Sequence, residues 1–309
     1  MAKLLFACIR FLVVSSVLLG STPLHAGTFR VATYNVENYL DQPTGSRPQV
    51  KSAEARAKVR ESIRALNPDV VALEEIGGLS ALMELRASLR AEGLEFRDWE
   101  YVTGADTNVH VAVLSRLPII ARRPHTNDAF LLDGRAFRVK RGFAEVDVRV
   151  NTDFTFTLLA GHLKSRLAAP DADEAEERLA EAKILRRIVD EHFARQPDVR
   201  LIVLGDFNDT KDTEAIKAII GRGKFKLTDT RPAERNGDDT PGNSRIGPRT
   251  ITWTYYYGKD DTYSRIDYIL LSPAMARDWV RGGTYVLAKP NWGVGSDHRP
   301  IVAEFETAN

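Results

Sequence analysis

Short, continuous apolar segments are the feature that most restricts the fold of this chain. Residues 70–73 (Val-Val-Ala-Leu) and 201–204 (Leu-Ile-Val-Leu) contain no polar side chain, which is typical of strands that are buried on both faces. Residues 53–66 instead carry their apolar side chains at a helical spacing. Strands of this kind need helices or a second sheet to cover them, so the sequence predicts layers of sheet and helix.

The same patterns place further elements along the chain. Strands are predicted at 29–34, 70–73, 109–115, 143–150, 154–160, 201–204, 251–257, 266–271 and 301–305. Helices are predicted at 53–66, 79–91 and 171–193. The long polar stretch 231–249 is predicted to be a surface loop, because strand patterns resume directly after it. A single domain is the simplest interpretation.

The first 26 residues differ in composition from the rest of the chain. Lys3 gives a basic start, residues 4–20 are mostly apolar, and Ala26 offers a small residue before a cut at Gly27. This is the layout of a secretory signal peptide. Arg10 interrupts the apolar stretch well below the roughly 18–20 residues that a membrane span needs, which disfavours an anchor. We therefore expect a signal peptide at 1–26 and an exported domain at 27–309, periplasmic or secreted, without stable membrane insertion.

Charge and cysteine content exclude several classes of protein. The 309-residue chain has 43 Lys and Arg, 42 Asp and Glu, a net charge of +1 and one cysteine. Loss of residues 1–26 removes Lys3, Arg10 and Cys8, which leaves a net charge of −1 and no cysteine. Binding of nucleic acid by bulk positive charge is thereby excluded. A disulfide framework and a cysteine zinc site are excluded as well.

Polar residues follow directly after several of the predicted strands. They are Asn35, Glu74, Glu75, His162, Asp206 and Asn208, with Asp267, Asp297 and His298 further along the chain. Taken singly, each carboxylate is more often a cap or turn residue, and each histidine is more often packed or exposed than catalytic. Taken together, an oxygen-rich set with two histidines and no thiol suits a hard cation such as Mg²⁺.

Seven motifs occur in a recognisable order. They are residues 33–36 (Thr-Tyr-Asn-Val), 71–75 (Val-Ala-Leu-Glu-Glu), 111–116, 161–165, 205–208 (Gly-Asp-Phe-Asn), 265–270 and 296–300 (Ser-Asp-His-Arg-Pro). In this order they resemble the motifs of the endonuclease/exonuclease/phosphatase superfamily, the deoxyribonuclease-I-like fold. The resemblance implies an α+β fold, a four-layer α/β/β/α sandwich of two mainly antiparallel sheets flanked by helices. It also implies hydrolysis of phosphate esters with a divalent metal.

Two positions depart from the family pattern. Glu74 stands where the family usually has Gln, so either Glu74 or Glu75 is the metal ligand, and alignment with the motif favours Glu75. Ser264 stands where abasic-site endonucleases of the family tend to carry a pocket Trp. This second departure, together with export, argues against an abasic-site repair enzyme.

The resemblance also implies roles for individual residues. Glu75, with Asp297 and Asn35, would hold Mg²⁺ or Mn²⁺. Asp206 would orient or deprotonate the attacking water, and Asn208 would donate a hydrogen bond to the phosphate.

Two histidines and one arginine complete the predicted site. His298 would contact a phosphoryl oxygen while Asp267 holds its ring. His162 would be the second phosphate contact or the acid that protonates the leaving group. Arg141 is either a phosphate clamp or part of a solvated charge run.

Three functions remain open at this stage. The first is an exported, monomeric phosphodiesterase that acts on nucleic acid, that is, a DNA or RNA nuclease. The second is a lipid or small-molecule phosphoesterase, similar to a sphingomyelinase or an inositol-phosphate phosphatase, which would gain from an exposed apolar hairpin. The third is a binding module without activity, which is weakened because every key polar position is retained.

Overall fold

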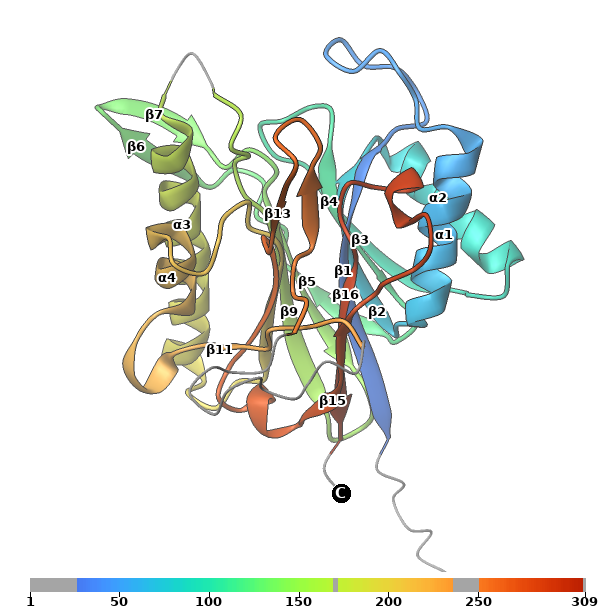
Figure 1. Cartoon of the computed structure of the whole chain (residues 1–309). Helices are drawn as coiled ribbons and strands as arrows, with labels where there is room; N and C mark the ends of the chain where they lie inside the picture. Colours follow the sequence, from blue (N-terminus) through green and yellow to red (C-terminus); the bar gives the residue numbers. More distant parts are fainter. Residues whose placement is uncertain (1–26, 169–171, 236–249, 308–309) are drawn as a thin grey trace, which may run out of the picture.

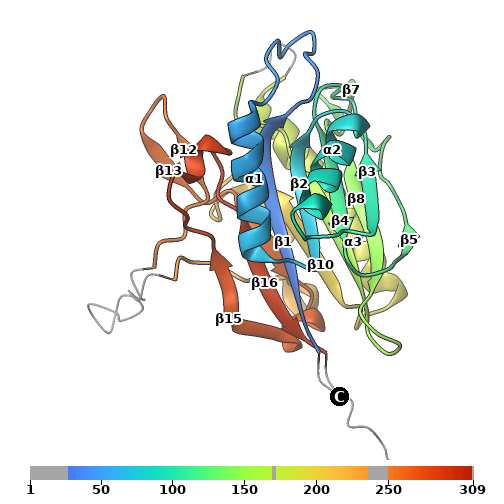
Figure 2. The same cartoon turned by 90° about the vertical axis from the view of Figure 1, so that its right-hand side faces the viewer.

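The computed structural model of the chain describes residues 27–168, 172–235 and 250–307. This part of the chain forms two six-stranded sheets that pack face to face, with four α-helices on their outer faces (Figures 1 and 2). The predicted four-layer α+β sandwich is therefore confirmed. The predicted signal peptide lies outside the described residues. No helix in the described ranges has the length and apolar character to cross a membrane.

The first sheet contains the beginning and the end of the described chain. Its strand order is β15 (Trp279–Val286), β16 (Ile301–Glu306), β1 (Thr28–Tyr39), β2 (Val70–Ile76), β4 (His110–Ser115) and β3 (Asp98–Val102). Strands β1 and β2 are parallel, and the other neighbours are antiparallel. The edge strands β3 and β15 were not predicted, because their partly exposed sequences mix polar and apolar residues.

The second sheet has the same size and the same mixture of directions. Its order is β11 (Thr228–Asp229), β14 (Asp267–Leu271), β10 (Leu201–Asp206), β9 (Thr155–His162), β8 (Phe143–Arg149) and β5 (Ile119–Arg122). Strands β9 and β10 are parallel, and the other neighbours are antiparallel. Each sheet thus contains one parallel pair, and in both sheets predicted site residues lie at the ends of that pair.

The helices divide between the two sheets. Helices α1 (Ala53–Leu66) and α2 (Leu79–Ala91) cover the first sheet, whereas α3 (Glu174–Arg195) and α4 (Glu214–Ile220) cover the second (Figures 1 and 2). The side chain of Ser52 caps α1, and Asn67 ends it in the left-handed region at a φ of 45°. The predicted helix at 171–193 begins at Glu174, because the side chain of Asp173 accepts hydrogen bonds from its first turn.

Two hairpins stand out from the sandwich at its upper end in Figure 1. One pairs β6 (Ala129–Leu132) with β7 (Arg135–Arg138), and the other pairs β12 (Tyr255–Tyr257) with β13 (Thr262–Ser264). The strand predicted at 251–257 is therefore shorter than expected, since only its last three residues pair. Residues 231–235 of the predicted surface loop have no regular structure, and 236–249 lie outside the described residues.

The main core lies between the two sheets. Phe29 on β1 stacks on Phe156 of β9 at 5.2 Å and on Phe305 of β16 at 5.3 Å between ring centroids. Near the carboxyl ends of β1, β2 and β10 this apolar layer gives way to buried polar groups, among them Glu74 and Asp206. The apolar core thus forms the floor of the predicted site.

Gly205 provides a test of how closely the two parallel strands must approach. It has a φ of +133°, and a Cβ atom built there would lie 1.9 Å from the backbone oxygen of Gly161 on β9. We expect Gly205→Ala to lower the free energy of unfolding by about 2 kcal/mol or more, because backbone strain and steric overlap add. Urea unfolding measures this change. Gly282→Ala, where a Cβ meets nothing within 4 Å, is the matched control, and equal losses in both variants would contradict the prediction.

Candidate active site

Asp206 is the centre of a buried hydrogen-bond network at the end of β10. Its carboxylate accepts a hydrogen bond from Nδ2 of Asn35 at 3.0 Å and another from the backbone N–H of Asn208 at 2.8 Å. Asn35 belongs to β1 in the first sheet, whereas Asp206 belongs to the second. The network therefore joins the two sheets, and Asp206 and Asn35 are each only 1% exposed.

Two histidines flank this carboxylate. Nε2 of His162 lies 3.5 Å from Oδ2 of Asp206, and Nε2 of His298 lies 3.7 Å from the same oxygen. On its other side, Nδ1 of His298 is hydrogen-bonded to Oδ2 of Asp267 at 2.9 Å. This is the carboxylate–histidine pair that the resemblance implied, and it fixes the orientation of the ring.

Local hydrogen bonds hold the segment that carries His298. The hydroxyl of Ser296 donates to the backbone oxygen of Asn35 at 2.7 Å and accepts from the backbone N–H of His298 at 3.0 Å. The ring of Tyr255 packs on the imidazole of His298, with 4.7 Å between centroids. His298 is thus positioned by β1 on one side and by the β12 hairpin on the other.

Neighbouring charges shift the pKa values of the two buried histidines in opposite directions. Burial alone lowers the pKa of His298, but the carboxylates of Asp267 and Asp206 outweigh it and raise the pKa well above its usual range. Burial, reinforced by the positive charge of Arg141, holds the pKa of His162 well below its usual range. His298 is therefore protonated at neutral pH and His162 is neutral. Burial also raises the pKa of Asp206 to about 7, with a further contribution from the charge of Asp267.

A second acidic group lies beside this network, at Glu75 and Asp297. Glu75 accepts hydrogen bonds from the backbone N–H of Asn38 at 2.9 Å and from Nδ2 of Asn35 at 3.4 Å. Burial raises the pKa of Asp297 to about 6, and the charges of Glu37 and Glu75 raise it as well. These are hard oxygen donors that repel one another, so a divalent cation suits them. That Glu75, Asp297 and Asn35 hold the metal, and that this metal is Mg²⁺ or Mn²⁺, stays a prediction.

The histidine side of the network offers a second arrangement of metal-binding groups. Asp206, Asp267 and His298 each present a ligand atom, and these atoms lie within 4.8 Å of one another. Within the described residues, this is the one group of three or more such side chains at that spacing. The geometry therefore supports a metal site in this region.

The carboxyl groups of Glu74 and Glu75 lie in clearly different surroundings. Glu74 is completely buried between the sheets, where its Oε1 accepts a hydrogen bond from the hydroxyl of Thr33 at 2.7 Å and its Oε2 has no partner. Burial raises the pKa of Glu74 well above its usual range. Glu75 has a φ of 64° where the register of β2 shifts, and its carboxylate contacts Asn35 and the backbone of Asn38. Glu74 is a neutral carboxyl in place of the usual Gln.

Asn208 and Arg141 are both bound within the protein. Nδ2 of Asn208 donates to the backbone oxygen of Leu163 at 3.0 Å and lies 3.4 Å from Oδ2 of Asp206. Nη1 of Arg141 donates to the same backbone oxygen at 3.0 Å. Arg141 is only 7% exposed, so it is not part of a solvated charge run. Its charge acts on His162, while phosphate binding by Arg141 and by Asn208 stays a prediction.

Sequence reasoning missed two basic residues of this site. Nζ of Lys51 donates a hydrogen bond to the backbone oxygen of Glu37 at 2.7 Å. Burial lowers the pKa of Lys51, and the negative charges of Glu37, Asp297 and Glu75 offset part of this shift. The charge of Arg47 lowers the pKa of His162. Both residues lie between β1 and α1, and no strand or helix pattern marks them there.

Comparison with known protein families explains why these residues occur together. The profile of the Endonuclease/Exonuclease/phosphatase family matches residues 32–298, which include every predicted site residue. The chain belongs to this family. Its members are phosphoester hydrolases, and the buried acidic and histidine groups described above are chemically suited to such a reaction. No protein with a curated description matches the sequence.

Solved structures with the same fold have diverse functions. An endonuclease/exonuclease/phosphatase family protein from Bacteroides thetaiotaomicron is 17% identical, with a TM-score of 0.57 over 92% of this chain and 99% of that one. Sphingomyelinase C from Streptomyces griseocarneus is 20% identical, with a TM-score of 0.60 over 91% and 100%. The human nocturnin catalytic domain is 16% identical, with a TM-score of 0.62 over 91% and 95%. At these identities the likeness shows the fold alone.

The buried carboxyl of Glu74 gives a pH-dependent test. Its folded-state pKa is raised, so the carboxyl stabilises the fold fully below its unfolded pKa and loses this contribution as the pH rises toward the folded value. We expect Glu74→Gln to be more stable relative to the natural protein at pH 8 than at pH 5. Urea unfolding at both pH values measures the difference.

An exposed glutamate supplies the control for this test. Glu54→Gln changes the same chemical group at the solvent-facing start of α1, and we expect no comparable gain at pH 8. If Glu74→Gln had the same relative stability at both pH values, Glu74 would have to be ionised in the fold.

Proposed function

We propose that this protein is an exported, monomeric, divalent-metal-dependent phosphodiesterase, and that it acts as a DNA or RNA nuclease. The observation that supports the catalytic part best is the buried network around Asp206, in which Asn35 and a His298–Asp267 pair converge on one carboxylate. A carboxylate and a protonated histidine so close together, beside further acidic groups, can act on neighbouring oxygens of one reacting phosphate, the attacking water and a phosphoryl oxygen.

In this proposal, metal binding and activation of the attacking water belong to different residues. Glu75 and Asp297, supported by Asn35, would hold Mg²⁺ or Mn²⁺, and the cation would neutralise negative charge on the phosphate. Asp206 orients the attacking water and takes its proton, which a carboxyl with a pKa raised to about 7 can retain near neutral pH. Asn35 fixes this carboxylate through its 3.0 Å hydrogen bond.

The two histidines serve the phosphate group in different ways. His298 is protonated, so its Nε2 donates a charged hydrogen bond to a phosphoryl oxygen while Asp267 holds Nδ1. His162 has a depressed pKa and an Nδ1 atom without a partner. This favours His162 as a neutral contact to the phosphate over the alternative role of leaving-group acid.

A lipid phosphoesterase is the second candidate, and exposed apolar side chains favour it. Leu131 on the β6–β7 hairpin is 74% exposed, and Leu167 in the loop before α3 is 69% exposed. A contiguous exposed apolar patch marks an interaction surface, whereas single exposed apolar residues are common, so these two side chains favour this candidate only weakly. The β12–β13 hairpin does not add to this argument, because its turn contains Lys259, Asp260 and Asp261.

The catalytic scheme makes a direct prediction for activity. With methyl 4-nitrophenyl phosphate and Mg²⁺ or Mn²⁺, we expect EDTA to abolish hydrolysis, and Asp206→Ala and His298→Ala each to lower kcat at least about 100-fold. Asp212→Ala, which removes an exposed carboxylate paired with Lys211, is the control and keeps full activity.

Two results of the same assay would contradict the catalytic scheme. Activity that resists EDTA, or full activity in both the Asp206 and the His298 variants, would exclude the mechanism. A parallel panel of DNA, RNA, sphingomyelin and inositol phosphates separates the nuclease from the lipid and small-molecule alternatives.

Export has its own test. When the full chain is expressed in a Gram-negative bacterium, we expect the protein to be recovered outside the cytoplasm with Gly27 as its first residue, because Ala26 precedes the predicted cut. N-terminal sequencing measures this. Cytoplasmic protein that still begins at residue 1 would exclude export.

A further inference from the structure

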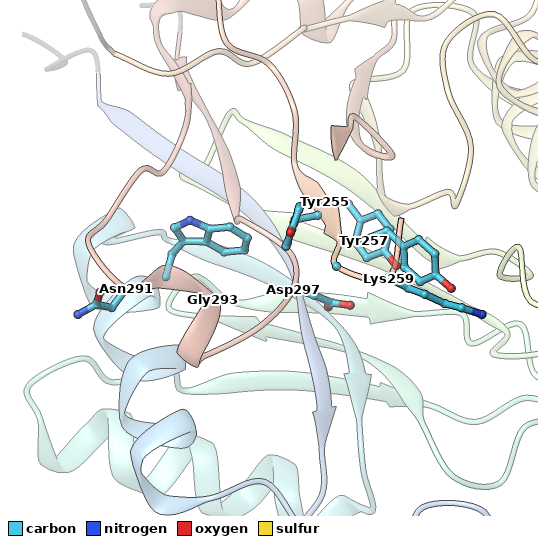
Figure 3. Close-up of a pocket in the computed structure, with 9 residues that line it drawn as sticks. Tyr255, Tyr257, Lys259, Asn291, Gly293 and Asp297 are labelled. Atoms are coloured by element: carbon cyan, nitrogen blue, oxygen red, sulfur yellow. The ribbon is translucent and has the colours of Figure 1, made fainter. Parts of the chain in front are cut away.

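An open pocket of about 580 Å³ is lined in part by Asp297, the residue before His298 (Figure 3). Its walls come from the β12–β13 hairpin and from the segment around η3 (Trp292–Val294). Aromatic side chains predominate: Tyr255, Tyr256 and Tyr257 line the pocket together with Trp292. Its volume falls within the range of small-molecule sites, and its lining combines apolar faces with a few polar groups.

The aromatic rings are supported by neighbouring rings. Trp292 packs on Trp253 with 5.3 Å between centroids, and Tyr256 packs on Tyr263 at 4.7 Å. The rings of Tyr255 and Tyr257 lie 6.3 Å apart and within 25° of parallel. Rings held in this way form a preorganised surface on which a planar group can stack.

Backbone and ring contacts tie the pocket to the catalytic network. The backbone N–H of Tyr256 donates to the backbone oxygen of Asp297 at 3.0 Å, and the ring of Tyr255 packs on His298. Asp297 lines the pocket and is also a predicted metal ligand (Figure 3). A phosphate at His298 would therefore place the next chemical group of the substrate in this pocket.

We propose that the pocket binds an unpaired nucleobase next to the scissile phosphodiester, which makes single-stranded nucleic acid the preferred substrate. The proposal rests on the proposed phosphodiesterase function. Stacking on aromatic side chains needs an exposed base face, which paired and stacked bases of a duplex do not offer. Asn291 lines the same pocket, and its amide can both donate to and accept from a base edge.

A quaternary ammonium headgroup is the competing occupant, because it also binds among aromatic rings. The positive charge of Lys259 in the lining opposes it, although the carboxylate of Asp297 in the same lining partly offsets that charge. The same positive charge favours a nucleotide, whose flanking phosphates are negative. The hairpin turn that carries Lys259 is polar and exposed, which argues against insertion into a lipid surface.

Binding of three phosphate monoesters tests the proposal independently of catalysis. We expect AMP to quench the tryptophan fluorescence of the protein with a Kd at least about tenfold lower than that of ribose 5-phosphate, which lacks the base. Tyr257→Leu should weaken AMP binding about 5- to 150-fold, and Tyr257→Phe should restore it. Trp279→Phe, in β15 and outside the pocket, is the control and should leave AMP binding unchanged.

The outcomes distinguish this inference from the proposed function. Equal affinities for AMP and ribose 5-phosphate, or tighter binding of phosphocholine than of AMP, would overturn the nucleobase pocket. Hydrolysis of methyl 4-nitrophenyl phosphate would still support a phosphodiesterase in that case. If the base is recognised in catalysis, the 4-nitrophenyl ester of thymidine 5′-phosphate has a lower KM than methyl 4-nitrophenyl phosphate. In the Tyr257→Leu variant the KM values of these two substrates lie closer together.

Discussion

The burial of Asp206 is the constraint around which this structure is organised. A carboxylate that is 1% exposed needs hydrogen-bond donors and nearby positive charge. Asn35 reaches it from the opposite sheet, and His298 approaches it from a loop held by Ser296. Strand β1 must therefore pair with its neighbours in one register, because a shift by one residue would turn Asn35 away from Asp206 in the other sheet.

The sequence indicated those parts of the fold in which side-chain pattern and burial agree. Residues 70–73 and 201–204 are apolar throughout and form the inner strands β2 and β10, whereas the edge strands β3 and β15 mix polar and apolar residues and were missed. The ordered motifs named Asp206, His298 and Asp267, and the fold brings ligand atoms of these three side chains within 4.8 Å of one another. Lys51 lies in irregular chain, and only the tertiary fold brings it to the acidic residues.

The adjacent residues Glu74 and Glu75 of β2 lie in two different environments. Glu75 faces Asn35 and remains hydrogen-bonded in the polar site, whereas Glu74 enters the layer between the sheets. Desolvation keeps the Glu74 carboxyl neutral, so it resembles the amide that the family pattern has at this position. A substitution that looks like added charge in the sequence therefore adds none to the folded site.

The position of β16 in the first sheet determines when that sheet can form all of its strand pairs. This last strand lies between β1 and β15, and Thr28 at the start of β1 pairs with Glu306 at its end. The first described strand must therefore wait for the last one, so the first sheet cannot close before β16 has been synthesised. Asp297 and His298 lie just before β16 and reach the site as it docks. A nascent chain that lacks residues 297–306 thus has neither a finished sheet nor a complete set of predicted catalytic groups.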